Sequence, residues 1–119
     1  MSARRERLGL FHQIGDYFVA ALLLLSLSRS AVIAWPLVLG LVALANAAMT
    51  RGPLAAYRRI PLALHRSIEV GFVAVCCAGA VLVRSHGVDA AALAAAGVLQ
   101  AGIVWLSHVA GRAKDDHRR

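Results

Sequence analysis

Four long stretches of apolar residues, separated by short polar segments, run along the chain. The stretches lie at about residues 8–28, 31–49, 64–83 and 89–111. As helices rising about 1.5 Å per residue, such stretches match the roughly 30 Å hydrocarbon core of a bilayer. The pattern therefore predicts an all-α polytopic membrane protein, in which four transmembrane helices form two hairpins in a small bundle. Residues 1–119 are expected to be one membrane domain, with a basic loop at 50–63 between the hairpins.

The composition of the chain agrees with a membrane protein and leaves little room for an enzyme. Apolar residues make up 60% of the sequence and charged residues 16%, whereas soluble domains have about 45–50% and about 25%. Four crossings of about 20 residues each would occupy about 80 positions, and the chain has 119. The sequence also shows no phosphate-binding glycine loop, nucleophile elbow or dinucleotide fingerprint. We therefore expect a protein that is not an enzyme.

A cleaved signal peptide is the alternative for the first apolar stretch. Arginines precede this stretch and small residues, Ser28 and Ser30, follow it, as in secretory signals. Asp16, however, would lie inside the apolar part of such a signal. We therefore expect the first stretch to be a retained helix.

The basic residues are distributed unevenly around the apolar stretches. Eleven of the 13 lie in the N-terminal segment, in the C-terminal tail and in the middle loop counted together with Arg66, and only Arg29 and Arg84 lie in the other two connections. Because positive residues accumulate on the cytoplasmic side of a membrane, both termini and the middle loop are expected in the cytoplasm. Arg outnumbers Lys twelve to one and Ala is abundant, a bias that we associate with bacteria. The expected location is therefore the bacterial plasma membrane.

The basic clusters favour lipid rather than nucleic acid as a partner, despite the net charge of +7. They are short, flank the apolar stretches and lack interleaved aromatic residues. In the middle loop, Pro53 and Pro61 limit any helix to about two turns, and Leu54 and Tyr57 are expected to dip into the lipid. A docking surface for a partner protein is the alternative use of this loop. The arginines expected to contact anionic lipid headgroups are Arg51, Arg58 and Arg59.

The first and third apolar stretches share a short pattern of residues. His12 and His65 are each followed four residues later by a carboxylate, Asp16 or Glu69, and then by Phe-Val-Ala. An Arg-Ser pair closes both stretches. The pattern favours an internal duplication of parallel hairpins, related by a pseudo-two-fold axis along the membrane normal. Both His/carboxylate pairs would then lie at one depth and, with a spacing of four, each pair would share one helix face.

These pairs belong to a predicted layer of polar side chains in the cytoplasmic half of the bundle, to which all four helices contribute. An ionisable group inside a membrane costs about 2.5–3.5 kcal/mol on insertion scales, which makes each one a candidate for function. The residues of this layer are His12, Asp16, Asn46, His65, Glu69, Ser107 and His108.

Four interpretations of the polar layer are compatible with these residue types. In the favoured one, which needs no cofactor, the side chains satisfy one another across helices, with Arg66 or a histidine pairing Asp16. In the second, they bind a Zn, Fe, Mn or Ni ion. In the third the carboxylates titrate in a proton or ion pathway, and in the fourth two imidazoles hold a b-type haem. The candidate metal ligands are His12, Asp16, His65 and Glu69, with His108 as a further one.

Small residues favour close helix packing in the third and fourth stretches. Cys76 and Cys77 precede an Ala-Gly-Ala segment, and Gly97 and Ala101 lie four residues apart. We interpret the cysteines as small packing residues, with a place on a soft-metal path as the alternative.

The function expected first from these patterns is that of an accessory or structural membrane component acting through helix association. Four short helices enclose little volume, so we expect a homo-oligomer or a subunit of a larger membrane complex. The alternative is a small transporter or a metal- or haem-binding membrane protein that uses the polar layer.

Overall fold

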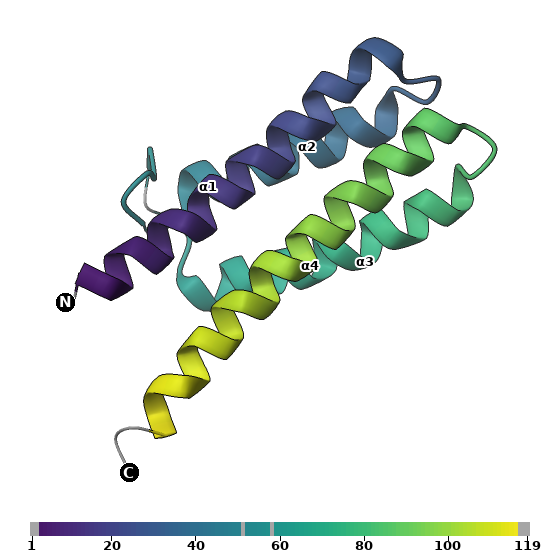
Figure 1. Ribbon diagram of the computed structural model, residues 1–119. Coiled ribbons are helices and arrows are strands. Elements are labelled where there is room, and N and C mark those ends of the chain that lie inside the picture. Colours follow the sequence, from purple (N-terminus) through teal and green to yellow (C-terminus); the bar gives the residue numbers. More distant parts are fainter. Residues whose placement is uncertain (1–2, 51, 58, 117–119) are drawn as a thin grey trace.

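Four long helices account for most of the chain (Figure 1). The computed structural model describes residues 3–50, 52–57 and 59–116. A single turn of 3-10 helix, η1 (Leu27–Arg29), follows the first long helix. The all-α class predicted from the apolar stretches is therefore confirmed. The long helices are α1 (Ala3–Ser26), α2 (Ala34–Met49), α3 (Leu62–Leu82) and α4 (Gly87–Asp116).

The helices pack side by side into a small bundle. α1 lies along both α2 and α4, and α4 also lies along α3, whereas α2 and α3 contact each other less. The beginning of α1, the end of α4 and the connection between α2 and α3 lie at one end of the bundle, which we call the N/C end (Figure 1). The other two connections lie at the opposite end.

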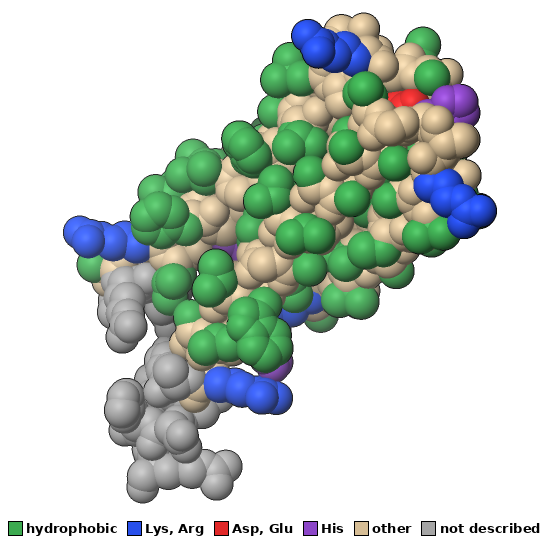
Figure 2. Space-filling model, turned by 45° about the vertical axis from the view of Figure 1, so that its right-hand side comes forward, with side chains coloured by type: hydrophobic (Ala, Val, Ile, Leu, Met, Phe, Trp, Pro, Cys, Tyr) green, Lys and Arg blue, Asp and Glu red, His purple; other side chains and the backbone are tan. Residues whose placement is uncertain are grey.

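Three of the described helices are long and apolar enough to cross a membrane. These segments are Glu6–Arg29, Leu62–Leu82 and Gly87–Ala110. α2 is also apolar but has only 16 residues. On the face shown in Figure 2, hydrophobic side chains cover the middle of the bundle, and Lys and Arg side chains lie toward its ends. This distribution is compatible with a membrane protein.

Two helices extend further than the apolar stretches predicted. α1 begins at Ala3 rather than at about residue 8, and α4 continues to Asp116 rather than to about residue 111. Arg, Lys and Glu, which occur in these extensions, are good helix formers in water. A helix can therefore continue beyond its apolar part, and hydropathy marks only that part.

The core contains apolar side chains from all four helices and depends on small residues. Leu23 and Leu93 are both fully buried in it, as is Cys76. A Cβ atom at Gly97 would lie 3.2 Å from the Cβ of Cys76 and 3.4 Å from the Sγ of Cys77. The cysteines thus lie where α3 and α4 approach closely, which supports their interpretation as small packing residues.

Asp89, in the first turn of α4, joins this helix to the connection between α1 and α2. The residue is 2% exposed. Its carboxylate accepts hydrogen bonds from the Ser30 hydroxyl and, at 2.9 and 3.1 Å, from the backbone N–H groups of Ala31 and Val32. These N–H groups belong to the two residues before Ile33, the N-cap of α2, so Asp89 holds the chain where it enters this helix. Asp89 therefore links the two halves of the bundle at the end opposite the N/C end.

Asp89→Ala is expected to lower the thermal midpoint of unfolding in detergent by about 5 °C, the shift that loss of one helix cap produces in a domain of about this size. Asp89→Asn keeps one acceptor oxygen and should have a smaller effect. Glu6→Ala, at an exposed position in the first turn of α1, is the matched control. Equal midpoints for the Asp89→Ala and Glu6→Ala variants would contradict the role assigned to Asp89.

Candidate metal centre

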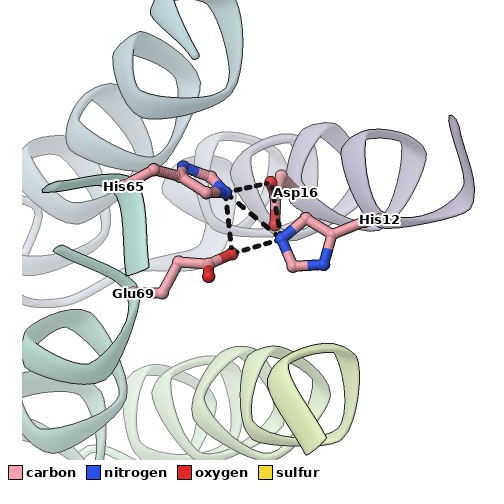
Figure 3. Close-up of side chains that lie close together, drawn as sticks. All are labelled: His12, Asp16, His65 and Glu69. Carbon is pink, nitrogen blue, oxygen red and sulfur yellow. Dashed lines mark hydrogen bonds and ion pairs between the residues drawn. The ribbon is translucent and has the colours of Figure 1, made fainter. Parts of the chain in front are cut away.

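Two helices bring four candidate metal-ligating side chains together (Figure 3). α1 provides His12 and Asp16, and α3 provides His65 and Glu69. Both helices have their beginnings at the N/C end (Figure 1), and His12, His65 and Glu69 lie in the halves of these helices nearer that end, with Asp16 near the middle of α1. The spacing of four places both members of each pair on one helix face. One nitrogen or oxygen atom from each side chain lies within 4.8 Å of the corresponding atoms of the other three. The two pairs thus lie at one depth, as the sequence repeat predicts.

The four side chains differ in how far they are shielded from solvent. Asp16 is 3%, His65 1% and Glu69 2% exposed, whereas the His12 side chain is 16% exposed. His12 therefore marks the open side of the site.

The distances between the four ligating atoms suit a small cation. The Nε2 atoms of the two histidines are 3.2 Å apart. The Oε1 atom of Glu69 lies 2.6 Å from Nε2 of His12 and 3.2 Å from Nε2 of His65. Both Nε2 atoms lie 3.6 Å from the Oδ2 atom of Asp16. Ligands held about 2.0–2.2 Å from a tetrahedral metal ion are about 3.3–3.6 Å apart. Four of the five distances lie near this range, whereas the His12 and Glu69 atoms, now 2.6 Å apart, would have to separate to admit an ion at the centre.

Each imidazole is held by a hydroxyl group on its other nitrogen, with Nδ1 of His12 lying 2.6 Å from the Ser107 hydroxyl. Nδ1 of His65 lies 2.8 Å from the hydroxyl of Thr50, which donates its only hydrogen to the Asn46 carbonyl at 2.5 Å. The Thr50 hydroxyl therefore accepts its hydrogen bond from the Nδ1–H group of His65. In a neutral ring protonated at Nδ1, the lone pair of Nε2 is directed toward the other three groups. Hydrogen bonds of this kind orient the histidine ligands of metal sites.

The carboxamide of Gln100 links the two carboxylates. Its nitrogen donates to Oδ1 of Asp16 at 2.8 Å and to Oε1 of Glu69 at 2.9 Å. Gln100 lies outside the layer predicted from the sequence, although it interrupts an apolar stretch seven residues before Ser107. Seven residues are about two helical turns, which places both on one face. Thr50 also lies outside the predicted layer, because it stands at the edge of the predicted loop.

The contacts around the site follow the two-fold relation suggested by the repeat. α1 and α3 each provide a histidine and a carboxylate. The hydroxyl that holds the α1 imidazole comes from α4, and the one that holds the α3 imidazole comes from the residue after α2. α2 and α4 also each place a carboxamide beside the carboxylates, Asn46 or Gln100. These correspondences are compatible with an internal duplication, although the two cross-helix distances between imidazole and carboxylate differ, at 2.6 and 3.6 Å.

The connection between α2 and α3 is attached to α1 next to the site. Gln13 accepts a hydrogen bond from the backbone N–H of Leu54 at 2.8 Å, and Tyr17 donates one to the carbonyl of Leu54 at 3.0 Å. A Cβ atom at Gly52 would lie 2.5 Å from the end of the Gln13 side chain, so a larger residue at this position would require Gln13 to shift. The attachment holds the end of α2, where Thr50 orients an imidazole.

Some residues named in the sequence analysis do not reach the site. His108 is exposed, because successive residues of a helix point about 100° apart and its neighbour Ser107 already faces His12. Arg66 is exposed as well. Of the two expected partners of Asp16, Arg66 or a histidine, the structure shows histidine, since Oδ2 of Asp16 lies 3.6 Å from the Nε2 atoms of His12 and His65. Among the arginines expected at lipid headgroups, Arg59 is exposed, and Arg51 and Arg58 lie outside the described residues.

The two imidazoles do not fit a haem. A haem ring would have to lie between them, but their Nε2 atoms are only 3.2 Å apart. The cavity that adjoins the site measures about 10 Å³, far less than a porphyrin requires. The haem interpretation of the polar layer is therefore wrong for this arrangement.

Comparisons with known proteins give no assignment for these residues, since the chain matches no protein family, no curated protein and no solved structure.

Proposed function

We propose that the chain is a small integral membrane protein that binds one divalent transition-metal ion between α1 and α3. The observation that carries this proposal is the convergence of two imidazoles and two carboxylates, with ligating atoms within 4.8 Å, at a largely buried position. An ion at their centre would use the lone pair of His65 Nε2. It would also contact Oδ2 of Asp16, which is buried and has no hydrogen-bond partner among the described residues.

The charges of the four groups match those of a divalent ion. Two ionised carboxylates carry a charge of −2 and two neutral imidazoles carry none, so a divalent cation brings the sum to zero. Neutrality matters because an uncompensated charge within a membrane is costly. Two protons would also bring the net charge of the four groups to zero. In the metal-free protein, Nε2 of His12 donates a hydrogen bond to Glu69 at 2.6 Å, and this proton competes with a metal ion for the site. Since metal must displace this proton, the affinity for metal should rise with pH.

The donor set favours a first-row transition metal. Imidazole suits Zn, Cu, Fe and Ni, whereas carboxylate oxygen suits Mn, Mg and Ca. A site with two donors of each kind is therefore suited to Zn²⁺, Fe²⁺, Mn²⁺ or Ni²⁺.

The packing beyond the site favours a bound ion over a conducted one. Toward the opposite end of the bundle, the space between the helices is filled by Val19, Leu23 and Leu93, each fully buried. The partly exposed ligand is His12. An ion would therefore enter and leave on the side of His12.

Protein stripped with a chelator and reloaded with Zn²⁺ or Mn²⁺ is expected to retain about one ion per chain, as measured by elemental analysis. A ligand at 100 times its Kd adds about 2.7 kcal/mol to the free energy of unfolding, so the thermal midpoint should rise with metal and fall with chelator. Retention should weaken as the pH is lowered. No retained ion at any pH, together with identical midpoints in Zn²⁺ and in chelator, would overturn the proposal.

The proposal includes a bacterial plasma-membrane location, with the helices crossing as two hairpins. The support for its orientation is that the beginning of α1, the end of α4 and the α2–α3 connection lie at one end of the bundle, and that the sequence segments 4–7, 51–66 and 112–119 carry eleven of the 13 basic residues. By the positive-inside rule that end faces the cytoplasm. The metal site then lies in the cytoplasmic half of the membrane.

Labelling of single cysteines on intact cells tests this orientation. In a background in which Cys76 and Cys77 are replaced by alanine, a membrane-impermeant maleimide should label Ser85→Cys strongly. It should label Ala56→Cys only after the membrane is permeabilised. Both positions are exposed, so access to the reagent depends on the side of the membrane. Strong labelling of Ala56→Cys on intact cells, with none of Ser85→Cys, would reverse the orientation.

An accessory role through helix association is the second candidate function. The observation that favours it is that hydrogen bonds of the site already connect α1 to α3 and α4, and α3 to the residue after α2, without any ion. In that role the site would specify helix packing, and a second copy or a larger membrane complex would cover the exposed apolar side chains.

A further inference from the structure

A small cavity lies beside the metal site, lined by residues of all four helices. Its volume is about 10 Å³, which is about the space that one water molecule requires. Apolar side chains of α2 and α3 form part of its wall. The polar residues that line it are Asp16, Asn46, Glu69 and Gln100.

Three oxygen atoms of these lining residues are buried and have no hydrogen-bond partner among the described residues: Oδ2 of Asp16, Oδ1 of Asn46 and Oε2 of Glu69. The three residues are 3%, 7% and 2% exposed. Buried polar atoms are normally satisfied by protein or by ordered water. Three unsatisfied acceptors around one cavity therefore indicate a ligand that supplies donors or positive charge.

A bound metal ion accounts for only one of the three oxygens. Oδ2 of Asp16 lies 3.6 Å from both Nε2 atoms, so this oxygen faces the ion. Glu69 approaches both imidazoles with Oε1, which leaves its Oε2 atom free. Asn46 is outside the group of four ligands. Two acceptors thus remain, which equals the number of hydrogen atoms that one water molecule can donate.

We propose that the cavity holds one water molecule, bound through its oxygen to the metal ion and donating its hydrogens to Asn46 and to Oε2 of Glu69. This inference rests on the metal site proposed above. The water would be a ligand in addition to the four protein groups, and Asn46 would be a positioning residue that holds it. The small volume of the cavity excludes larger ligands.

A water ligand changes the chemical character of the site. Structural metal sites are closed by protein ligands, whereas sites that exchange or activate ligands keep a position for water. The ion bound here would therefore keep one exchangeable position, on the side of the cavity.

Electron–nuclear double resonance of the Mn²⁺-loaded full chain in oxygen-17-enriched water tests the proposal. We expect nitrogen couplings from two imidazoles and an oxygen-17 coupling from one directly bound water. Asn46→Leu removes the amide acceptor at similar side-chain size. It should lower the oxygen-17 signal at least about twofold, because one water hydrogen loses its acceptor, while the nitrogen couplings and the Mn²⁺ content stay unchanged.

A matched pair of substitutions on α2 separates the cavity from general effects on the helix. Ala43 is buried and lines the cavity, whereas Ala45 is exposed. Ala43→Val should displace the water and remove the oxygen-17 signal, and Ala45→Val should leave it unchanged.

The outcomes distinguish this inference from the metal site on which it rests. Nitrogen couplings without an oxygen-17 coupling in the unmodified chain would overturn the water ligand and leave the metal site intact. An oxygen-17 signal that is undiminished in both Asn46→Leu and Ala43→Val would place the water elsewhere and also overturn the inference. Absence of bound Mn²⁺, or of nitrogen couplings, would contradict the metal site itself and the water ligand with it.

Discussion

His12→Ala and His65→Ala are each expected to lower the affinity of the protein for Zn²⁺ by more than about 100-fold. Loss of a hydrogen-bonding partner of a ligand typically costs about 10–100-fold in metal affinity, and removal of a ligand should cost more. The effect should be large for both residues, because each Nε2 atom lies in the group of four ligating atoms. Competition with a chelator of known affinity measures the change in detergent-solubilised protein.

Two other histidines provide matched controls for these variants. His108 and His86 are both exposed, and neither belongs to the group of four ligating residues. His108→Ala and His86→Ala should therefore leave the affinity for Zn²⁺ within about twofold of the unmodified value, as expected of surface histidines outside a metal site. If all four variants bound Zn²⁺ equally well, the site would lie elsewhere in the chain.

His65→Leu, measured in chelator, is expected to lower the free energy of unfolding by about 3 kcal/mol, because Thr50 and the two buried carboxylates each lose a polar neighbour. The buried Glu69 carboxylate would then contact only one imidazole, that of His12. The double change of His65→Leu with Glu69→Leu removes both polar members and should recover more than half of that loss. The pair of His12→Leu with Asp16→Leu should behave in the same way. Chemical unfolding in detergent measures each difference.

The double variants also separate a binding site from a scaffold. Their stability should recover, but their affinity for Zn²⁺ should not, because leucine offers no lone pair to an ion. If the double variants recover stability and also support normal cellular function, the polar residues serve packing alone. If His65→Leu by itself leaves stability unchanged in chelator, the assumption that His65 stabilises the buried polar cluster is wrong.

The sequence predicts the helices and the four candidate ligands because both depend on local spacing. A stretch of about 20 apolar residues and a His/carboxylate spacing of four are properties of a single helix. The repeat of this spacing also predicts that the two pairs lie at one depth, since the same pattern recurs near the start of two parallel helices. The ligating atoms of His12 and Glu69, 57 positions apart along the chain, do meet at 2.6 Å.

The residues that surround the ligands are harder to predict, because their roles depend on how helices rotate against one another. Ser107 and His108 are equally polar neighbours, and only the rotation of α4 decides that Ser107 faces the site. Gln100 offers a signal, as a polar residue in an apolar stretch, but its two carboxylate partners come from other helices. Thr50 contacts His65 from the connection after α2. The sequence of this connection has no helical repeat from which the position of Thr50 could be predicted.

X-ray absorption spectroscopy of the Zn²⁺-loaded protein tests the metal site most directly. The account predicts a first shell of nitrogen and oxygen atoms at about 2.0–2.2 Å, with the outer-shell scattering of two imidazole rings. This pattern should disappear in the double change of His65→Leu with Glu69→Leu. A shell that contains sulfur at about 2.3 Å, or one that lacks imidazole, would contradict the assignment of His12, Asp16, His65 and Glu69 as the ligands.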